Sequence, residues 1–344
     1  MSMETTIQEE QSQREWDRYA ETHPDATQYH RWHWRTVVEQ SFGHTTYYLS
    51  ARQNNRIVGL LPLVVMKSRL FGKFMISMPF FNYGGLLSDT SDAADRLLQR
   101  AEEIGHREDI AFIELRHLRK QPSLPATKEH KVTMILELEK NEDRQWAAFG
   151  AKLRNQIRKA QKSGLSLSAG GSELLDEFYH VFSINMRDLG TPVYAKRFFQ
   201  NILGQFPDAS QLFIVRCQDR PVAAALAVWF RETLEIPWAS SIHHYRALCP
   251  NNFLYWEAIR WAIHHGFRQF DFGRSTVGEG TYKFKEQWGA QPVPLYWQYR
   301  LRQGASLPDL SPKNPKYRLA VELWRRCPVS ITRWIGPRIV KHIP

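Results

Sequence analysis

One segment of the chain, residues 270–289, combines residue types that suit the handling of anionic or acyl groups. It reads FDFGRSTVGEGTYKFKEQWG. The alternation predicts a strand with Phe270 and Phe272 on one face and Asp271 on the other, broken at Gly273. A strand that ends in a polar, Gly-rich loop is where α/β proteins usually place ligands. The segment closes with aromatic and charged residues: Tyr282, Lys283, Phe284, Lys285, Glu286 and Trp288. Lysines among aromatic side chains suit an anionic ligand or the charge of an acyl-transfer transition state.

Three residues of this segment are candidates for catalysis. Asp271 lies on the strand just before the loop, where its carboxylate could accept a proton from an attacking amine or hold that amine in place. An ion pair between Asp271 and Arg274 is an equally supported alternative. Tyr282 is a candidate to protonate a leaving group. Lys285 has aromatic neighbours in the sequence and is therefore expected in the site rather than extended along the surface.

The composition indicates a globular protein of about two domains. The chain has 344 residues, of which 43% are hydrophobic, and a domain averages roughly 150 residues. Cys217, Cys249 and Cys327 are far apart and lack metal-ligand spacing, as do the scattered histidines, so neither a disulfide framework nor a metal site is expected. The N-terminal sequence lacks a signal-peptide pattern, and the longest apolar runs are too short to span a bilayer. These features favour a cytoplasmic protein.

The net charge of +11 is concentrated in the C-terminal tail. From Lys313 onward there are eight Lys/Arg and one acidic residue. The rest of the chain is only mildly basic, which argues against a DNA-binding or general nucleic-acid-binding protein. The tail alternates cations with apolar residues, and we expect Pro328 and Pro337 to split it into short pieces. Packing of its apolar side chains on the body is expected, with peripheral contact to an anionic membrane surface as the alternative.

The two halves of the chain repeat one order of elements, which is hairpin, strand, loop, helix and strand. In the first half we expect strands at 45–51, 57–66, 74–79 and 110–116 and a helix at 92–104. In the second half we expect strands at 212–216, 222–230, 233–240 and 268–272, a loop at 242–250 and a helix at 252–265. Asp92 suits the N-cap of the first helix and Gly105 its C′ position. The result is an α+β architecture built twice, each a mixed, mostly antiparallel sheet with one helix crossover.

A cationic helix is expected between the two halves. Its apolar stripe recurs at three- and four-residue spacing: Trp146, Phe149, Leu153, Ile157 and Ala160. The rest of its surface is positively charged, and Arg154, Arg158 and Lys162 stack on one face. A solvated basic face and a surface for a phosphate-bearing partner both remain open.

Four segments in combination resemble the FemAB-like family: NYGG at 82–85, LRNQIRKAQKSGL at 153–165, MRDLGTP at 186–192 and DFGRS…FKEQWG at 271–289. YHRWHW at 29–34 and NPKYRLAVELWRR at 314–326 are similar to FemAB-like proteins associated with exosortase (PEP-CTERM) and exopolysaccharide gene clusters. The family consists of tandem GNAT-fold domains. The resemblance thus implies a GNAT-like domain at 1–145 that forms an acceptor groove. It further implies a GNAT-like domain at 146–300 for donor binding and catalysis, and a basic amphipathic tail at 301–344.

The resemblance implies an acyltransferase or aminoacyltransferase that acts on an amine of a cell-envelope, peptidoglycan-like or exopolysaccharide precursor. Its acceptor would be a small-molecule or lipid-linked glycan. Well-studied members use aminoacyl-tRNA and carry a helical arm in the second domain. The stretch between 211 and 295 has no room for such an arm, which leaves acyl-CoA as an equal or better donor. Lys285 corresponds to the family lysine near the reacting acyl group, where a cation would stabilise an oxyanion or a phosphate.

The resemblance also assigns binding residues. The donor pyrophosphate of a GNAT domain lies on backbone N–H groups where the fourth strand gives way to the main helix. Donor-binding residues would then be His244, Arg246, Asn251, Asn252 and Arg274, although the usual closely spaced glycines are missing and a simple helix cap is the alternative for the two asparagines. Acceptor-binding residues would be Asn82, Tyr83, Arg154, Arg158 and Arg187. A rival from another class is a non-catalytic protein that holds an anionic glycan or RNA.

Overall fold

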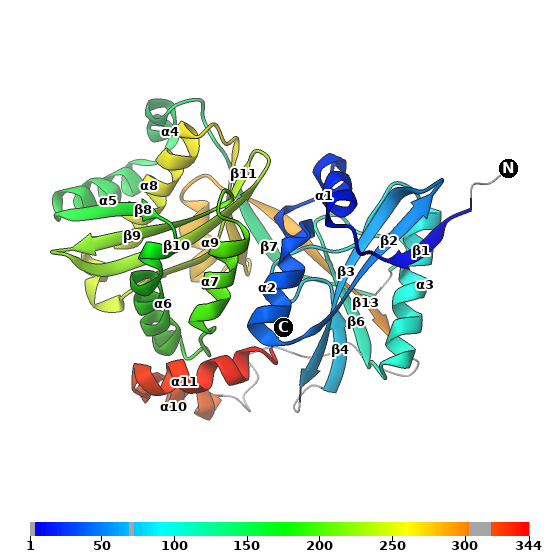
Figure 1. Ribbon diagram of the computed structural model, residues 1–344. Coiled ribbons are helices and arrows are strands. Elements are labelled where there is room, and N and C mark those ends of the chain that lie inside the picture. The colour runs from blue at the N-terminus through cyan, green and yellow to red at the C-terminus, as the bar shows by residue number, and fades with distance from the viewer. Residues whose placement is uncertain (1–3, 69–71, 125, 303–317, 344) are drawn as a thin grey trace. The chain divides into compact units, whose positions relative to one another are not determined.

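The computed structural model describes residues 4–68, 72–124, 126–302 and 318–343, which form two compact units (Figure 1). Unit 1 contains residues up to Lys131, the stretch that begins at Pro294 and the residues from Lys341. Unit 2 contains Val132–Val293 and the stretch that ends at Val340. The sheet of unit 1 includes β13 (Gln291–Leu301), and the sheet of unit 2 includes the second part of β7 (Ala126–Glu137). Each sheet therefore takes a strand from outside its own half of the sequence.

Unit 1 is built on a mixed, mostly antiparallel sheet in the order β1-β2-β3-β4-β6-β13, with β5 beside β3. Its other strands are β1 (Thr6–Glu9), β2 (Thr45–Gln53), β3 (Arg56–Ser68), β4 (Gly72–Ile76), β5 (Leu87–Ser88) and β6 (Phe112–His117). β4 and β6 are parallel, and α3 (Ser91–Arg107) makes the crossover between them. A parallel pair needs such a crossover because the chain must return to the same end of the sheet.

Helices cover both faces of the unit 1 sheet, because successive side chains of a strand point to opposite faces. Tyr47 and Leu49 of β2 belong to the core that includes the apolar side chains of α3. Tyr48 lies between them in sequence and packs instead with Trp16 of α1. The helices on this side are α1 (Gln13–Thr22), η1 (Gln28–His30) and α2 (His33–Phe42). Burial on both faces explains why β2 and β3 are almost continuously buried.

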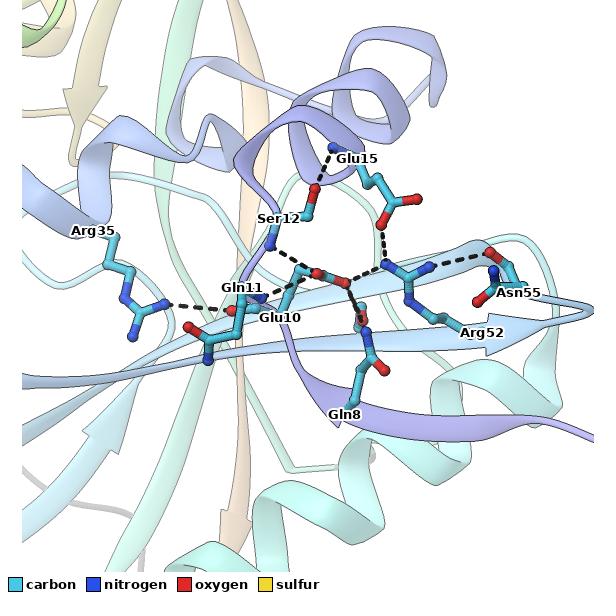
Figure 2. A network of polar contacts seen from close by, with 9 residues as sticks. Gln8, Glu10, Gln11, Ser12, Glu15, Arg35, Arg52 and Asn55 are labelled. Carbon is cyan, nitrogen blue, oxygen red and sulfur yellow. Dashed lines mark hydrogen bonds and ion pairs between the residues drawn. The ribbon is translucent and has the colours of Figure 1, made fainter.

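A buried ion pair fixes the N-terminal segment of unit 1. The Glu10 carboxylate accepts hydrogen bonds from Arg52 Nη2 (2.6 Å), Ser50 Oγ (2.9 Å) and the Ser12 N–H (2.9 Å), as Figure 2 shows for the network around it. Burial by itself would raise the pKa of Glu10. The hydrogen bonds from Arg52, Ser12, Ser50 and Gln8 outweigh that effect and lower the pKa to about 2. The connection from β1 to α1 is thereby tied to β2.

Unit 2 repeats the arrangement, with its sheet in the order β7-β12-β11-β10-β9-β8. Its strands besides β7 are β8 (Leu165–Gly170), β9 (Ser210–Cys217), β10 (Arg220–Phe230), β11 (Thr233–Ser241) and β12 (Gln269–Ser275). β11 and β12 are parallel and the other neighbours are antiparallel. The crossover between the parallel strands runs through η3 (His243–Leu248) and α8 (Pro250–His264).

Helices also cover both faces of the unit 2 sheet. Ala225 of β10 packs in the core that holds α5 and α8. The next residue, Leu226, is paired with Trp238, so both lie on the other face, and there Trp238 contacts Phe198 and Phe199 of α7 edge-on. The remaining helices are α4 (Glu142–Ala148), α5 (Ala151–Lys162), η2 (Ser172–Leu174), α6 (Leu175–Leu189), α7 (Lys196–Gln205), α9 (Gly280–Glu286), α10 (Arg318–Arg326) and α11 (Val329–Val340).

The repeated order of hairpin, strand, helix and strand is confirmed in both units. The domain limits differ from those expected. Unit 2 begins at Val132 rather than residue 146, because the second part of β7 pairs with β12. The end of β13 joins unit 1 because it pairs with β6, and α10 and α11 join unit 2 because they pack on α6. Residues 303–317 of the expected tail lie outside the described residues.

Several expected helix ends were wrong. Thr90, not Asp92, caps α3 by accepting a hydrogen bond from the Ala93 N–H, and Gly105 lies inside that helix. The single helix expected around residues 146–160 is two helices, because the backbone is extended at Phe149 and Gly150. Pro337 lies in the last turns of α11 without ending it. A proline there removes only one backbone donor near the end of the helix.

Candidate active site

The two parallel strands of unit 2, β11 and β12, stop pairing midway along their length. In the part of the chain that the structure describes, β11 and β12 pair over Thr233–Glu235 and Gln269–Asp271 and not beyond. Both strands are irregular just after that point. In β11 the pairing with β10 shifts by a residue across a stretch that contains Pro237, which has no N–H to donate. In β12 the pairing with β7 shifts across Gly273, which has a φ of +73°. The two strands thus diverge in a fork. Beyond Glu235 and Asp271, their backbone groups no longer hydrogen-bond to each other.

Lys285 of α9 is buried beside this fork. Its side chain is 8% exposed, and its Nζ donates hydrogen bonds to the carbonyl oxygens of Gly273 (2.8 Å) and Arg274 (2.9 Å). Burial lowers the pKa of Lys285 to about 8. The carboxylates of Asp271 and Glu235 oppose this change, and the charge of Arg274 adds to it. The expectation that Lys285 lies inside rather than along the surface agrees with this position.

Two acidic side chains are buried at the level where the strands stop pairing. Asp271 is 1% exposed, and its Oδ1 accepts hydrogen bonds from Thr133 Oγ1 (2.5 Å) and from the Gly273 N–H (2.7 Å). Glu235 is opposite Asp271 in the parallel register and is 2% exposed. Asp271 therefore holds the irregular turn of β12 in place. Together with Lys285, the two carboxylates form a buried cluster of charges at the fork.

Sequence analysis missed Glu235 and Thr133. A signal for Glu235 was present, since it is an acidic residue within the otherwise apolar strand LEIPWA, and a buried acid needs a polar partner. No local signal identifies Thr133, which lies 138 positions from Asp271 in the sequence. It reaches the site only because β7 crosses into the sheet of unit 2.

The other candidates near Lys285 differ in exposure. Tyr282 lies one turn before Lys285 on α9 and is half-buried against the unit 2 core. Arg274 is exposed. The aromatic neighbour Trp288 is 1% exposed and contacts Phe149 and Phe272, so it belongs to the unit 2 core rather than to the surface.

The first turn of α8 follows β11 and starts at the same edge of the sheet as the fork, because the ends of parallel strands meet there. It has no side-chain cap and no acidic residue. Cys249 is the N-cap in a left-handed conformation (φ 55°), and Pro250 follows it. The expectation that Asn251 or Asn252 caps this helix was wrong, because the helix begins before them. Its free backbone N–H groups and positive dipole end suit an anion.

The expected donor-binding residues lie around this helix start. His244 and Arg246 are exposed on η3, and Arg246 Nη1 is 3.0 Å from His243 Nε2. Asn251 is half-buried. Asn252 is 7% exposed, and its Nδ2 donates a hydrogen bond to Gln156 Oε1 of α5 (3.3 Å). Asn252 thus connects α8 to the cationic helix α5.

The cationic helix α5 packs its apolar side on α8. Arg158 is exposed and lies over the ring of Trp146, 5.3 Å from its centroid. Arg154 is half-buried, and its Nε is buried without a hydrogen-bond partner among the described residues. A buried guanidinium N–H without a partner is costly, which makes Arg154 the cation of this helix most in need of a ligand.

The other three expected acceptor residues, Arg187, Asn82 and Tyr83, contact neighbouring parts of the fold. Arg187 pairs with Asp188 (2.6 Å) and donates a hydrogen bond to the Cys327 carbonyl (3.2 Å), so it helps to hold the connection between α10 and α11. Asn82 and Tyr83 lie in unit 1 and are 8% and 5% exposed. The Tyr83 ring contacts Tyr29. Within unit 2 the structure brings Asp271, Lys285 and Arg274 together, whereas Arg187 contacts the connection between α10 and α11.

Comparison with known proteins supports one fold. Residues 148–286 match the family described as acetyltransferase (GNAT) domain. No curated protein matches the sequence. Among solved structures, FemX is 16% identical with a TM-score of 0.69, and the match covers 93% of this chain and 100% of that chain. L-PGS from Bacillus licheniformis is 13% identical with a TM-score of 0.56, covering 95% and 98%. A tandem GNAT protein from the clavulanic acid biosynthesis pathway is 12% identical with a TM-score of 0.54, covering 89% and 100%.

At these identities the similarity to solved structures shows the fold alone. That fold is the one found in each unit, where the described residues form a mixed, mostly antiparallel sheet with a helix crossover between two parallel strands. The chain therefore consists of two tandem GNAT-like domains, and its residues 148–286 match the GNAT acetyltransferase domain family.

Proposed function

We propose that unit 2 transfers an acyl group from acyl-CoA to an amine of a cell-envelope precursor, such as a peptidoglycan-like or exopolysaccharide glycan. The observation that carries this proposal is the fork between β11 and β12, where buried Lys285, Asp271 and Glu235 lie next to an uncapped helix start. A buried lysine with a lowered pKa, as Lys285 has, favours a functional site in such a position.

The donor would bind along the mouth of the fork. Its pyrophosphate would lie on the N–H groups at the start of α8, with Arg246 as a nearby cation. The pantetheine amides would pair with the backbone of β11 beyond Glu235, where β12 no longer pairs with it. This path would deliver the thioester to Lys285.

The chemistry would be a direct transfer. The acceptor nitrogen attacks the thioester carbonyl, the C–N bond forms, the C–S bond breaks, and the thiolate takes up a proton as it leaves. An ammonium has three N–H donors, and two of those on Lys285 are occupied by carbonyls. The third would stabilise the oxyanion. Asp271 and Glu235, the two buried carboxylates at the fork, are the proposed acceptors for the amine proton. Tyr282 remains the proposed proton donor to the thiolate.

The start of α3 in unit 1 differs from the start of α8. At the start of α3, Thr90 caps the helix and Asp92 adds a negative charge in the first turn. An anion would be repelled where the start of α8 would attract it. We therefore place the reaction in unit 2 alone. Arg154 and Arg158 are retained as cations for a phosphate of the acceptor.

The connections within unit 2 favour acyl-CoA over aminoacyl-tRNA as the donor. From Gln211 to Leu295 the described chain runs through β9, β10, β11, η3, α8, β12, α9 and β13 with short connections. No helical arm of the type that the FemAB-like resemblance would supply is present in that described stretch.

Two measurements test the proposal. Thermal shift with acetyl-CoA, longer acyl-CoAs and aminoacyl-tRNA should show stabilisation by acyl-CoA, because a ligand that binds the native state raises its melting temperature. Acyl transfer to an amino-sugar acceptor should fall by roughly a hundredfold or more in Lys285→Met, the size seen when one oxyanion donor is removed.

Lys283→Met is the matched control, because Lys283 lies on the same helix and is exposed; its rate should be unchanged. Equal rates for Lys285→Met and wild type would reject the assigned site. If an anionic glycan or RNA stabilised the protein and no acyl donor did, the result would favour a non-catalytic binding protein over an enzyme.

A further inference from the structure

Most exposed large apolar side chains of the described chain gather in one region. Seven such side chains are more than a third exposed, and six of them lie on α10, α11 and the end of α6: Leu189, Leu319, Leu323, Ile331, Trp334 and Ile339. The seventh, Val277, lies in the loop before α9. We name the group of six the apolar patch. The expectation that the apolar residues of the tail pack on the body is thus wrong for the five members of the patch that lie on α10 and α11.

The patch forms continuous stripes on the two C-terminal helices. On α10, Leu319 and Leu323 are one turn apart and are 69% and 56% exposed. On α11, Ile331 and Trp334 are three residues apart and are 43% and 66% exposed. Both helices pack on α6, as Figure 1 shows in red beneath it. A tight turn at Cys327 and Pro328 links the two helices.

The opposite side of α11 is docked on unit 2, which directs Ile331 and Trp334 outward. On α11, Thr332, Gly336 and Val340 are buried. Gly336 approaches Val193 so closely that an added Cβ would lie 2.8 Å from its backbone nitrogen. Arg333 donates a hydrogen bond to Ser183 Oγ of α6 (2.8 Å). The exposure of Ile331 and Trp334 is therefore a consequence of how α11 packs in unit 2.

Three exposed arginines, Arg325, Arg326 and Arg338, lie on the same two helices as the apolar side chains. Residues 318–340 contain five arginines and one acidic residue. Arg325 and Arg326 at the end of α10 are exposed, as is Arg338, whose guanidinium lies 4.4 Å from the centroid of the Trp334 ring. Apolar side chains interleaved with cations, with a tryptophan among them, are typical of helices that lie at the surface of an anionic bilayer. The apolar core of a protein–protein interface is instead depleted of charge.

We propose that α10 and α11 form a docking surface for an anionic membrane, with the apolar patch in the headgroup region and the arginines on lipid phosphates. No helix among the described residues is long and apolar enough to cross the bilayer. The contact is therefore peripheral. It goes beyond the proposed acyl transfer and does not depend on it.

Vesicle co-sedimentation of the full chain tests the proposal, with phosphatidylcholine vesicles and with vesicles that also contain phosphatidylglycerol. Binding should require the anionic lipid and weaken as salt is added. The triple variant Leu319→Ser, Leu323→Ser, Trp334→Ser should bind at least tenfold more weakly. Arg326→Glu, added to the triple variant, should weaken binding to anionic vesicles further. All these side chains are exposed, and circular dichroism will show that the variants fold.

Val277→Ser is the matched control, since Val277 is equally exposed but lies outside the patch; its binding should equal that of the wild type. Equal binding by the triple variant, or no binding by the wild type, would overturn the proposal. A dimer in sedimentation velocity that the triple variant abolishes would assign the patch to self-association instead. Because transfer to a soluble acceptor should be unchanged in the triple variant, failure here is distinguishable from failure of the proposed function.

Discussion

Glu10 and Lys285 are both charged residues with little exposed surface. They differ in whether their surroundings favour the charged form. Glu10 keeps its charge at any ordinary pH because several donors surround its carboxylate. In Lys285, burial outweighs the nearby carboxylates, and the pKa falls to about 8. A buried charge that its hydrogen-bond partners stabilise indicates a structural role. A buried charge that its surroundings destabilise indicates a function. This contrast separates the two residues more clearly than their exposure does.

Glu10→Gln should destabilise the fold by about 2 kcal/mol at neutral pH, the size of a hydrogen-bonded charged group. The pKa of Glu10 is lower in the folded state (about 2) than its ordinary value of 4.5. Its contribution is therefore present above pH 4.5 and is lost as the pH falls through 2. Urea unfolding at several pH values measures this difference. Glu9→Gln is the control, because the pair between Glu9 and Arg35 is partly exposed and contributes little. A difference that persists in strong acid would contradict the assignment.

At the scale of elements, the sequence allowed the repeat to be predicted but not its irregularities. The hairpins and crossover helices follow from apolar periodicity and glycine positions. The fork does not, because it depends on how Pro237 and Gly273 meet their neighbouring strands. Thr133 reaches Asp271 through a strand from before the second repeat. Local patterns carry no information on such pairing, so Lys285 and Asp271 could be predicted as candidates while their partners could not.

The docking of α11 on α6 depends on the absence of a side chain at Gly336. Gly336→Ala should weaken this docking, because the new Cβ would meet the backbone of Val193. Hydrogen exchange in residues 329–340 should speed up, and the melting temperature should fall. Gly204→Ala is the control, because Gly204 lies in α7 with no atom close to the added Cβ. That variant should be stabilised by up to about 1 kcal/mol. Unchanged exchange in Gly336→Ala would show that the contact is not limiting.

At the scale of the whole molecule, two units of the same fold differ at the start of their crossover helices. The start of α3 is closed by Thr90 and Asp92, whereas the start of α8 has neither cap nor acid. Lys285 and its carboxylate neighbours belong to unit 2. A repeated fold thus supplies two scaffolds, of which one has the features of a donor site. This asymmetry is the central claim of the functional account.

Hydrogen exchange with and without coenzyme A tests this claim most directly, because every acyl-CoA shares that group. Protection is expected at the start of α8, within residues 243–253, and around Lys285, within residues 273–285. No change is expected at the start of α3, within residues 87–94. Protection at α3 instead, or at neither helix start, would contradict the account.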